Sequence, residues 1–216
     1  MKDKYVQERK KMIEQQLKPR GIKDPEVLEA FLTVPRHEFV PENLKHNAYQ
    51  DRPLPIQEGQ TISQPFIVAQ MIEALKPKPG KKMLEVGTGS GYATAVLSRI
   101  INRVYSIERY PELAEQAEKK FEKLGYDNIE VTVGDGTKGW EEKSPFAGIM
   151  VSAAAPDIPE PLIEQLEVGG YLVIPVGGKN LQDLYQVKKI SDNDLNQKNL
   201  GSVRFVPLVG EEGWAF

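Results

Sequence analysis

Apolar residues in the first third of the chain recur at helical spacing. One set follows Asp24-Pro25, which is typical of a helix cap and a first-turn proline, and comprises Val27, Leu28, Phe31 and Leu32. A second set follows Pro65 and comprises Ile67, Val68, Met71, Ile72 and Leu75. A shorter apolar stripe precedes both, at Met12, Ile13 and Leu17. Between the two longer sets, prolines at 35, 41, 53 and 55 predict an irregular segment over residues 35–60.

From about residue 80 onward, short apolar runs alternate with amphipathic segments. The runs predict strands at 83–86, 104–107, 129–133, 146–151 and 171–176. The segments between them predict helices at 93–100, 111–124 and 161–166. Such alternation implies a parallel sheet with right-handed crossovers and helices on both faces. Two further strands, at 184–190 and 203–209 around a polar loop at 191–199, could add an antiparallel edge.

We therefore predict an α/β fold with a doubly wound, mostly parallel sheet, an N-terminal helical extension and antiparallel C-terminal strands. We expect a single domain over residues 1–216, divided into N-terminal helices and loop (1–60), a cofactor-binding core (61–180) and C-terminal strands (181–216). A composition of 40% hydrophobic and 27% charged residues is typical of a globular domain. Residues 211–216 show no pattern that assigns them a role.

Composition excludes several kinds of chemistry. The chain has no cysteine, which rules out disulfides, thiolate metal sites and cysteine nucleophiles. Its two histidines leave little material for a metal cluster or a catalytic triad, so we expect no metal. A net charge of −3 without a long basic run does not favour nucleic acid as a partner. The first residues do not form a secretory signal and no long apolar run follows, so we expect a cytoplasmic protein without membrane contact.

The sharpest motif joins the first predicted strand to the next helix: Leu84-Glu85-Val86-Gly87-Thr88-Gly89-Ser90-Gly91-Tyr92. Open α/β sheets bind ligands at such turns, because glycines admit a ligand close to the backbone and the helix N-terminus offers free N–H groups. A dinucleotide-binding fingerprint has the form G-x-G-x-x-G, whereas this turn reads G-x-G-x-G. No glycine-lysine pair follows, so a P-loop is excluded. A tight turn without a ligand remains the alternative.

Acidic residues stand at three successive strand ends. Glu85, beside the glycine turn, would repel pyrophosphate and favour a cationic ligand. Glu108 ends the second strand, where a carboxylate can accept both ribose hydroxyls. Asp135, in Gly134-Asp135-Gly136 after the third strand, can accept an adenine amino group. S-adenosylmethionine has an ammonium group, a sulfonium and no phosphate, and it fits this combination, although each acid alone could be a solvated strand end or a turn residue.

The chain resembles a known family, the protein-L-isoaspartate O-methyltransferases, whose fold is the Rossmann-like form of class I methyltransferases. The resemblance runs from about residue 10 to about residue 210. The glycine turn alone indicates only the class. The segments that carry the resemblance are the glycine turn, Val34-Pro35-Arg36, Phe39-Val40, Gly59-Gln60-Thr61-Ile62-Ser63-Gln64-Pro65, Gly134-Asp135-Gly136 and Arg204-Phe205-Val206-Pro207-Leu208. The Thr-Ile-Ser-Gln-Pro and Phe-Val-Pro-Leu segments are the most specific.

The resemblance implies a protein repair enzyme that methylates the free carboxyl of L-isoaspartyl, and of some D-aspartyl, residues in damaged proteins and peptides. S-adenosyl-L-methionine would be the donor and S-adenosyl-L-homocysteine the product. Separately, we expect the protein to be a monomer. Ser63 matches the family's active-site serine, whereas Val209 stands where some members carry a threonine. We expect the cofactor-binding residues to be Thr61, Ile62, Ser63, Glu85, Gly87, Thr88, Gly89, Glu108, Arg109, Asp135 and Gly136.

The chemistry of this reaction needs little from the histidines. A carboxyl with a pKa of about 4 is already ionised at neutral pH, so it can attack the sulfonium methyl without a general base. Ser63 is then best interpreted as a hydrogen-bond donor that orients the carboxylate, because nothing would activate it as a nucleophile. From spacing alone, a helix-capping serine before Pro65 is the competing interpretation. Rival functions are a small-molecule methyltransferase, a non-catalytic nucleotide-binding module and, less in keeping with the glycine spacing, an NAD-dependent dehydrogenase.

Overall fold

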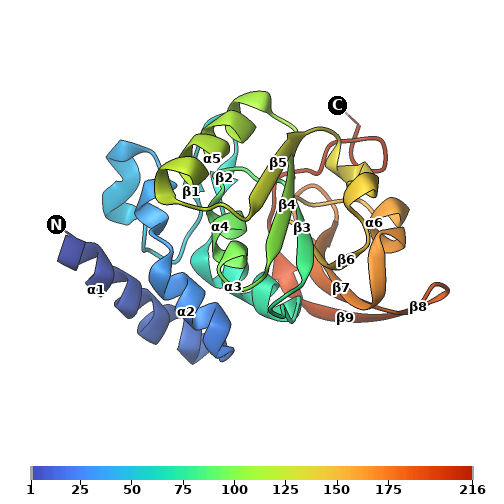
Figure 1. Cartoon of the computed structure of the whole chain (residues 1–216), viewed down its shortest axis with the longest axis horizontal. Helices are drawn as coiled ribbons and strands as arrows, with labels where there is room; N and C mark the ends of the chain where they lie inside the picture. The colour runs from blue at the N-terminus through green and yellow to red at the C-terminus, as the bar shows by residue number, and fades with distance from the viewer. Residues whose placement is uncertain (1, 216) are drawn as a thin grey trace.

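The computed structural model describes residues 2–215 and is built on a seven-stranded sheet in the order β5-β4-β3-β6-β7-β8-β9 (Figure 1). Strands β5, β4, β3, β6 and β7 run parallel to one another. Strands β8 and β9 are added antiparallel at the β7 edge. The strands are β3 (Lys82–Val86), β4 (Arg103–Glu108), β5 (Ile129–Val133), β6 (Phe146–Val151), β7 (Leu166–Gly177), β8 (Gln182–Ser191) and β9 (Asp194–Val203). The predicted mostly parallel sheet with antiparallel C-terminal strands is confirmed.

Each face of the sheet carries its own apolar core, because successive strand residues point to opposite sides. In β3, Met83 belongs to one core and Leu84 to the other. The first core is covered by the helices α3 (Pro65–Ala74), α4 (Tyr92–Ser98) and α5 (Pro111–Leu124), and the second by α6 (Glu160–Glu164) (Figure 1). Helices on both faces are what the alternating pattern predicts.

The N-terminal helices form a further layer outside α3 and α4. The helices α1 (Lys2–Met12) and α2 (Pro25–Thr33) pack on each other, and α2 contacts both α3 and α4. As predicted, Asp24 caps α2, since its side chain accepts the backbone N–H groups of Glu26 at 2.9 Å and Val27 at 3.3 Å. No helix within residues 2–215 has the length and apolarity needed to cross a lipid bilayer.

Short elements connect these layers and confirm the irregular segment predicted over residues 35–60. A two-stranded antiparallel sheet joins β1 (Leu54–Pro55) to β2 (Thr61–Ile62). The remaining elements are single helical turns at Ile13–Leu17, Lys18–Arg20, Arg36–Glu38, Glu42–Asn47, Gly136–Lys138 and Glu141–Lys143. Within this part of the fold, β2 leads directly into α3 and brings the Thr61–Pro65 motif to the sheet.

The sequence prediction is wrong over residues 191–209. The predicted polar loop at 191–199 is mostly β9, which pairs with β8 through a tight turn between Ser191 and Asp194. Most side chains of β9 are exposed, so the strand shows no alternation of apolar and polar residues. The predicted strand at 203–209 instead runs extended beside the segment after β6, with Ala154 bridging Pro207. Val203 ends β9 and packs in the first core with Phe205, whereas Val206 and Leu208 pack in the second core and line the cavity.

Candidate active site

The site lies at the carboxyl ends of β3 and β4. In the sheet, β4 lies on one side of β3 and β6 on the other, so the order of the strands reverses at β3. Ligands of open α/β sheets bind at such a reversal of strand order. A cavity occupies this place. It is lined by residues 60–63, Val68, 85–90, Tyr92, Ala93, 107–110, Gly136, Ser152, Ala153 and 206–209.

The glycine turn forms one wall, and its shape is fixed by what packs behind it. Gly87, Gly89 and Gly91 have φ values of 93°, 52° and 87°, which L-residues with side chains rarely adopt. At Gly91 a side chain is excluded as well, since an added Cβ would lie 2.8 Å from the ring of Phe121 on α5. The Thr88 hydroxyl is 2.6 Å from that of Ser106 on β4. The third glycine therefore allows α5 to pack against the start of α4.

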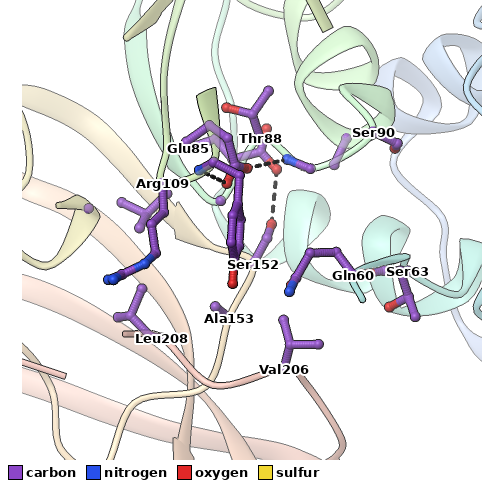
Figure 2. Close-up of a pocket in the computed structure, with 18 of the residues that line it drawn as sticks. Gln60, Ser63, Glu85, Thr88, Ser90, Arg109, Ser152, Ala153, Val206 and Leu208 are labelled. Carbon is purple, nitrogen blue, oxygen red and sulfur yellow. Dashed lines mark hydrogen bonds between the residues drawn. The ribbon is translucent and has the colours of Figure 1, made fainter. Parts of the chain in front are cut away.

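Glu85 lies beneath the turn with only 1% of its surface exposed. Its carboxylate accepts the hydroxyls of Thr94 at 2.5 Å and Ser152 at 2.9 Å, the latter drawn in Figure 2. Burial raises the pKa of Glu85 to about 7, because removal from water disfavours the charged form and the two hydroxyls compensate only in part. An ionised Glu85 is thus costly here until a cation comes near.

Glu108 ends β4 and is 5% exposed. One carboxylate oxygen accepts the backbone N–H of Gly89 at 2.7 Å, and the other accepts that of Tyr110 at 3.0 Å. Both bonds orient the carboxylate and tie it to the glycine turn, yet each oxygen keeps a second lone pair for a ligand. Glu108 is therefore held ready on the cavity wall.

Asp135 takes a different position from the other predicted residues, which all line the cavity. One of its oxygens accepts the backbone N–H and the hydroxyl of Thr137 at 2.9 and 2.7 Å, and the other accepts the backbone N–H of Glu211 at 2.8 Å. Burial alone would raise the pKa of Asp135, but these donors outweigh it and hold that pKa below its ordinary value. Its role as an adenine contact remains a prediction.

Ser63 lies at the junction of the cavity with an adjoining open groove. The groove is lined by Arg20, Pro53, Thr61, Ser63, Gln64, Ile67, Ser152, Leu181 and residues 202–206. Within residues 2–215 nothing hydrogen-bonds the Ser63 hydroxyl, and it is Gln64 that occupies the N-cap position of α3. The helix-cap interpretation of Ser63 is therefore wrong, and its hydroxyl is available to a ligand.

Two buried anchors hold the loop that carries Ser63. The fully buried Arg36 donates to the Ser63 carbonyl at 2.8 Å and to the Ala48 carbonyl at 2.7 Å. Asp51 accepts the Gln64 side-chain amide at 2.7 Å and the Phe66 backbone N–H at 3.0 Å. Arg36 belongs to the Val-Pro-Arg motif, so the structure gives that motif a positioning role that the sequence alone did not reveal.

The C-terminal segment closes the far side of the cavity, which sequence reasoning missed. In Figure 2, Val206 and Leu208 stand opposite Glu85, while Ser63 and Arg109 face the cavity from different sides. Arg109 donates to the Val209 carbonyl at 2.9 Å. Other lining residues that were not predicted are Gln60, Ser90, Tyr92, Tyr110, Ser152 and Ala153. Ser152 and Ala153 follow β6, so the rule that ligands bind beyond strand ends could have found them.

These residues suit S-adenosylmethionine. The turn brings glycine backbone without Cβ atoms to the cavity wall, and buried carboxylates flank it. Glu85 lacks a cationic partner in the described chain, as its hydrogen bonds come from hydroxyls. These carboxylates favour a ligand with an ammonium group and ribose hydroxyls, and they disfavour pyrophosphate.

Comparisons with known proteins agree with this chemistry. The family model described as protein-L-isoaspartate(D-aspartate) O-methyltransferase matches residues 7–213. A protein-L-isoaspartate O-methyltransferase of Pelotomaculum thermopropionicum is 58% identical, covering 98% of this chain and 93% of its own. One of Syntrophus aciditrophicus is 52% identical over the whole of both chains.

Solved structures are similar as well. A structure named protein-L-isoaspartate O-methyltransferase superposes with a TM-score of 0.84 at 32% identity, covering 95% of this chain and 67% of that one. A Plasmodium falciparum protein, described as a β-aspartate methyltransferase in complex with S-adenosyl-L-homocysteine, gives a TM-score of 0.78 at 28% identity, covering 95% of this chain and 98% of that one.

Proposed function

Because the chain belongs to the protein-L-isoaspartate(D-aspartate) O-methyltransferase family, we propose that its cavity holds the methyl donor and its groove the damaged peptide. The enzyme transfers a methyl group from S-adenosylmethionine to the free carboxyl of isoaspartyl residues, a protein repair reaction. One observation carries the division between donor and acceptor: the Ser63 hydroxyl, free of other hydrogen bonds in the described chain, stands where cavity and groove meet.

On the donor side, the cavity residues bind and orient. Bound S-adenosylmethionine supplies an electrophilic methyl group on a positively charged sulfur. Glu85 would face the ammonium group beside the glycine turn, and Glu108 would accept the ribose hydroxyls. Asp135 would accept the adenine amino group from the edge of the cavity. The residues assigned to donor binding are Thr61, Ile62, Glu85, Gly87, Thr88, Gly89, Glu108, Arg109, Asp135 and Gly136. Ser63 borders the donor as well, but its hydroxyl is assigned to the acceptor.

On the acceptor side, Ser63 orients the reacting carboxylate by donating a hydrogen bond. No group in the chain needs to remove a proton, because a carboxyl with a pKa of about 4 is ionised at neutral pH. Aligning two bound reactants can lower the barrier by about 7–11 kcal/mol. Arg36 and Asp51 contribute by holding the Ser63 loop in place. The groove adjoins the cavity and reaches from Arg20 and Pro53 to residues 202–206, so a peptide bound there could extend away from the donor.

The test offers radiolabelled S-adenosylmethionine with two peptides that differ only in an isoaspartyl or a normal aspartyl residue. Base-labile label on the isoaspartyl peptide alone is the expected result, because a methyl ester hydrolyses in base. Label on both peptides, or on neither, contradicts the function. Ser63→Ala should bind S-adenosyl-L-homocysteine like the wild type and methylate slowly, which places the serine on the acceptor side.

We also propose that the enzyme works in the cytoplasm as a monomer and without nucleic acid. One copy of the chain lines both cavity and groove, so no second subunit is needed to complete them. The net charge of −3 does not favour a polyanion such as nucleic acid as a partner. Sedimentation at working concentration should give the mass of one chain, and a dimer would contradict the proposal.

A further inference from the structure

The last residues of the chain fold into a tight turn, Gly210–Trp214, which we name the C-terminal turn. Its closing bonds run from the Gly213 N–H to the Gly210 carbonyl at 3.1 Å and from the Trp214 N–H to the Leu208 carbonyl at 2.8 Å. The Trp214 indole N–H donates to the Ala154 carbonyl at 3.0 Å, beside the cavity-lining Ala153. The turn is thus fastened to the segment that follows β6.

A second set of contacts joins the C-terminal turn to the loop after β5. The Glu211 N–H donates to one oxygen of Asp135 at 2.8 Å, and the Glu212 N–H donates to the Thr137 hydroxyl at 3.2 Å. The Glu211 carboxylate also forms an ion pair with Lys138. Backbone amides of the turn therefore reach the loop that carries Asp135.

Close packing makes this junction specific. A Cβ added at Gly210 would lie 2.0 Å from the other oxygen of Asp135 and 2.7 Å from a methyl carbon of Thr137. The Asp135 carboxylate is thus held between the Thr137 donors, the Glu211 amide and the bare backbone of Gly210. The oxygen that accepts from Glu211 retains a free lone pair, since a carboxylate oxygen can accept two hydrogen bonds.

We propose that the C-terminal turn fixes the Asp135 carboxylate for recognition of the adenine amino group, so that Gly210 and Glu211 are positioning residues of the donor site. The inference rests on the proposed function in that Asp135 is taken as the adenine contact. A carboxylate at the edge of the cavity discriminates between bases only if its direction is fixed. The turn supplies that direction from a part of the sequence with no other assigned role.

The experiment measures binding by calorimetry with two probes, S-adenosyl-L-homocysteine and S-inosyl-L-homocysteine. The second probe replaces the amino group, a donor, with a carbonyl oxygen that a carboxylate repels. A hydrogen bond to a charged group predicts that the wild type prefers the adenosyl probe by about 10- to 100-fold. Gly210→Ala should cut this preference to about threefold or less, because the new methyl group displaces the carboxylate.

Two controls separate this effect from general damage. Gly178→Ala makes the same chemical change where the nearest atom beyond the adjacent residues, the Leu181 carbonyl oxygen, would be 3.8 Å from the new Cβ, and it should keep the wild-type preference. Lys138→Ala removes the ion pair but leaves the Glu211 amide in place, and it too should keep the preference. In the unliganded protein, hydrogen exchange at the Glu211 amide should be faster in Gly210→Ala than in Gly178→Ala.

The outcomes are distinct. A wild-type preference retained in Gly210→Ala, or unchanged exchange at Glu211, overturns the inference and leaves the proposed function intact. Equal binding of both probes by the wild type removes Asp135 as the adenine contact, and the inference falls with it. If the wild type binds neither probe, the proposed function itself fails.

Discussion

The cavity and the groove meet at Ser63 but differ in charge and in rigidity. The charged residues of the cavity lining are two buried acids, Glu85 and Glu108, and Arg109, whose guanidinium bonds a backbone carbonyl. The charged residues of the groove lining are arginines, Arg20 and Arg204. The cavity acids are fixed by hydrogen bonds, whereas Arg204 is exposed on an irregular segment.

This difference matches the two reactants. The donor is a cation and the acceptor is a carboxylate, so each meets charge of the opposite sign. The fixed acids cost no reorganisation when the donor binds. In the groove, Arg20 is held by an ion pair with Asp51, whereas the exposed Arg204 can adjust to peptides of varied sequence. Variants in each region can show whether the cavity and the groove act separately.

The largest effect is expected at Ser63, where the cavity and the groove meet. Ser63→Ala should lower kcat about 50-fold, the effect of losing one hydrogen bond to a charged group. Affinity for S-adenosyl-L-homocysteine should not change, because the glycine turn and Glu108 are untouched. Ser191→Ala, at the exposed end of β8, is the matched control. Unchanged turnover in Ser63→Ala would show that the junction does not orient the acceptor.

The next largest effect is expected at Glu108, on the cavity wall that binds the methyl donor. Glu108→Gln replaces one accepting oxygen with an N–H donor that faces a backbone N–H, of Gly89 or Tyr110. Calorimetry should show S-adenosyl-L-homocysteine binding about 20-fold more weakly, with the peptide KM unaltered. Glu112→Gln, in the exposed first turn of α5, should behave like the wild type. An equal loss in both variants would mean that a diffuse field, rather than a placed carboxylate, holds the donor.

Glu85 gives the cavity a pH dependence that the groove lacks. Its pKa of about 7 in the free protein means that it is largely protonated at pH 6, and the ammonium group of the ligand favours the ionised form. Affinity for S-adenosyl-L-homocysteine should therefore rise about tenfold from pH 6 to pH 8 and level off above, with proton release on binding. Glu85→Gln should flatten this profile, and a profile left unchanged would exclude Glu85 from the ammonium site.

The same group affects the stability of the free protein in the opposite direction. Because the folded-state pKa of Glu85 lies above its ordinary value of 4.5, the folded state binds the proton more tightly than the unfolded state does. Its contribution to the free energy of unfolding should therefore fall as pH rises from about 4.5 to about 7, by about 3 kcal/mol. Denaturant titrations of wild type and Glu85→Gln across this range measure the difference.

The smallest effect belongs to the groove. Arg204→Ala should raise the KM for an isoaspartyl peptide with acidic flanking residues about threefold, since exposed ion pairs contribute little. Added salt should erase the difference, and donor affinity should stay constant. Lys198→Ala, on β9 and outside the groove lining, serves as control. A change in donor affinity in Arg204→Ala would show that the two regions are coupled.

Much of the fold was predictable because its elements bury a regular apolar face. Strands β5 and β6 have the predicted bounds, and α2 begins at the predicted cap. The first strand of the C-terminal hairpin was predictable, but β9 was not, because it has exposed residues on both faces and therefore no periodic pattern. Conversely, the apolar run at 203–209 resembles a strand, but beyond Val203 its side chains pack in the two cores and line the cavity.

The residues of the site likewise fall into a group that the sequence could predict and a group that it could not. Residues in one contiguous motif, such as the glycine turn or Thr61–Ser63, could be predicted because the motif itself places them together. Arg36 and the C-terminal turn could not, because their roles depend on contacts between segments far apart in the sequence. The outward position of Asp135 has the same origin, since its partner Glu211 lies 76 residues away.

The wall contributed by Val206–Val209 has a consequence for proteolysis. This segment follows β9, the last strand of the seven-stranded sheet. A cut before Val206 would therefore leave every strand of the sheet in place and remove one side of the donor cavity. Limited proteolysis at this segment should abolish donor binding while the sheet stays folded.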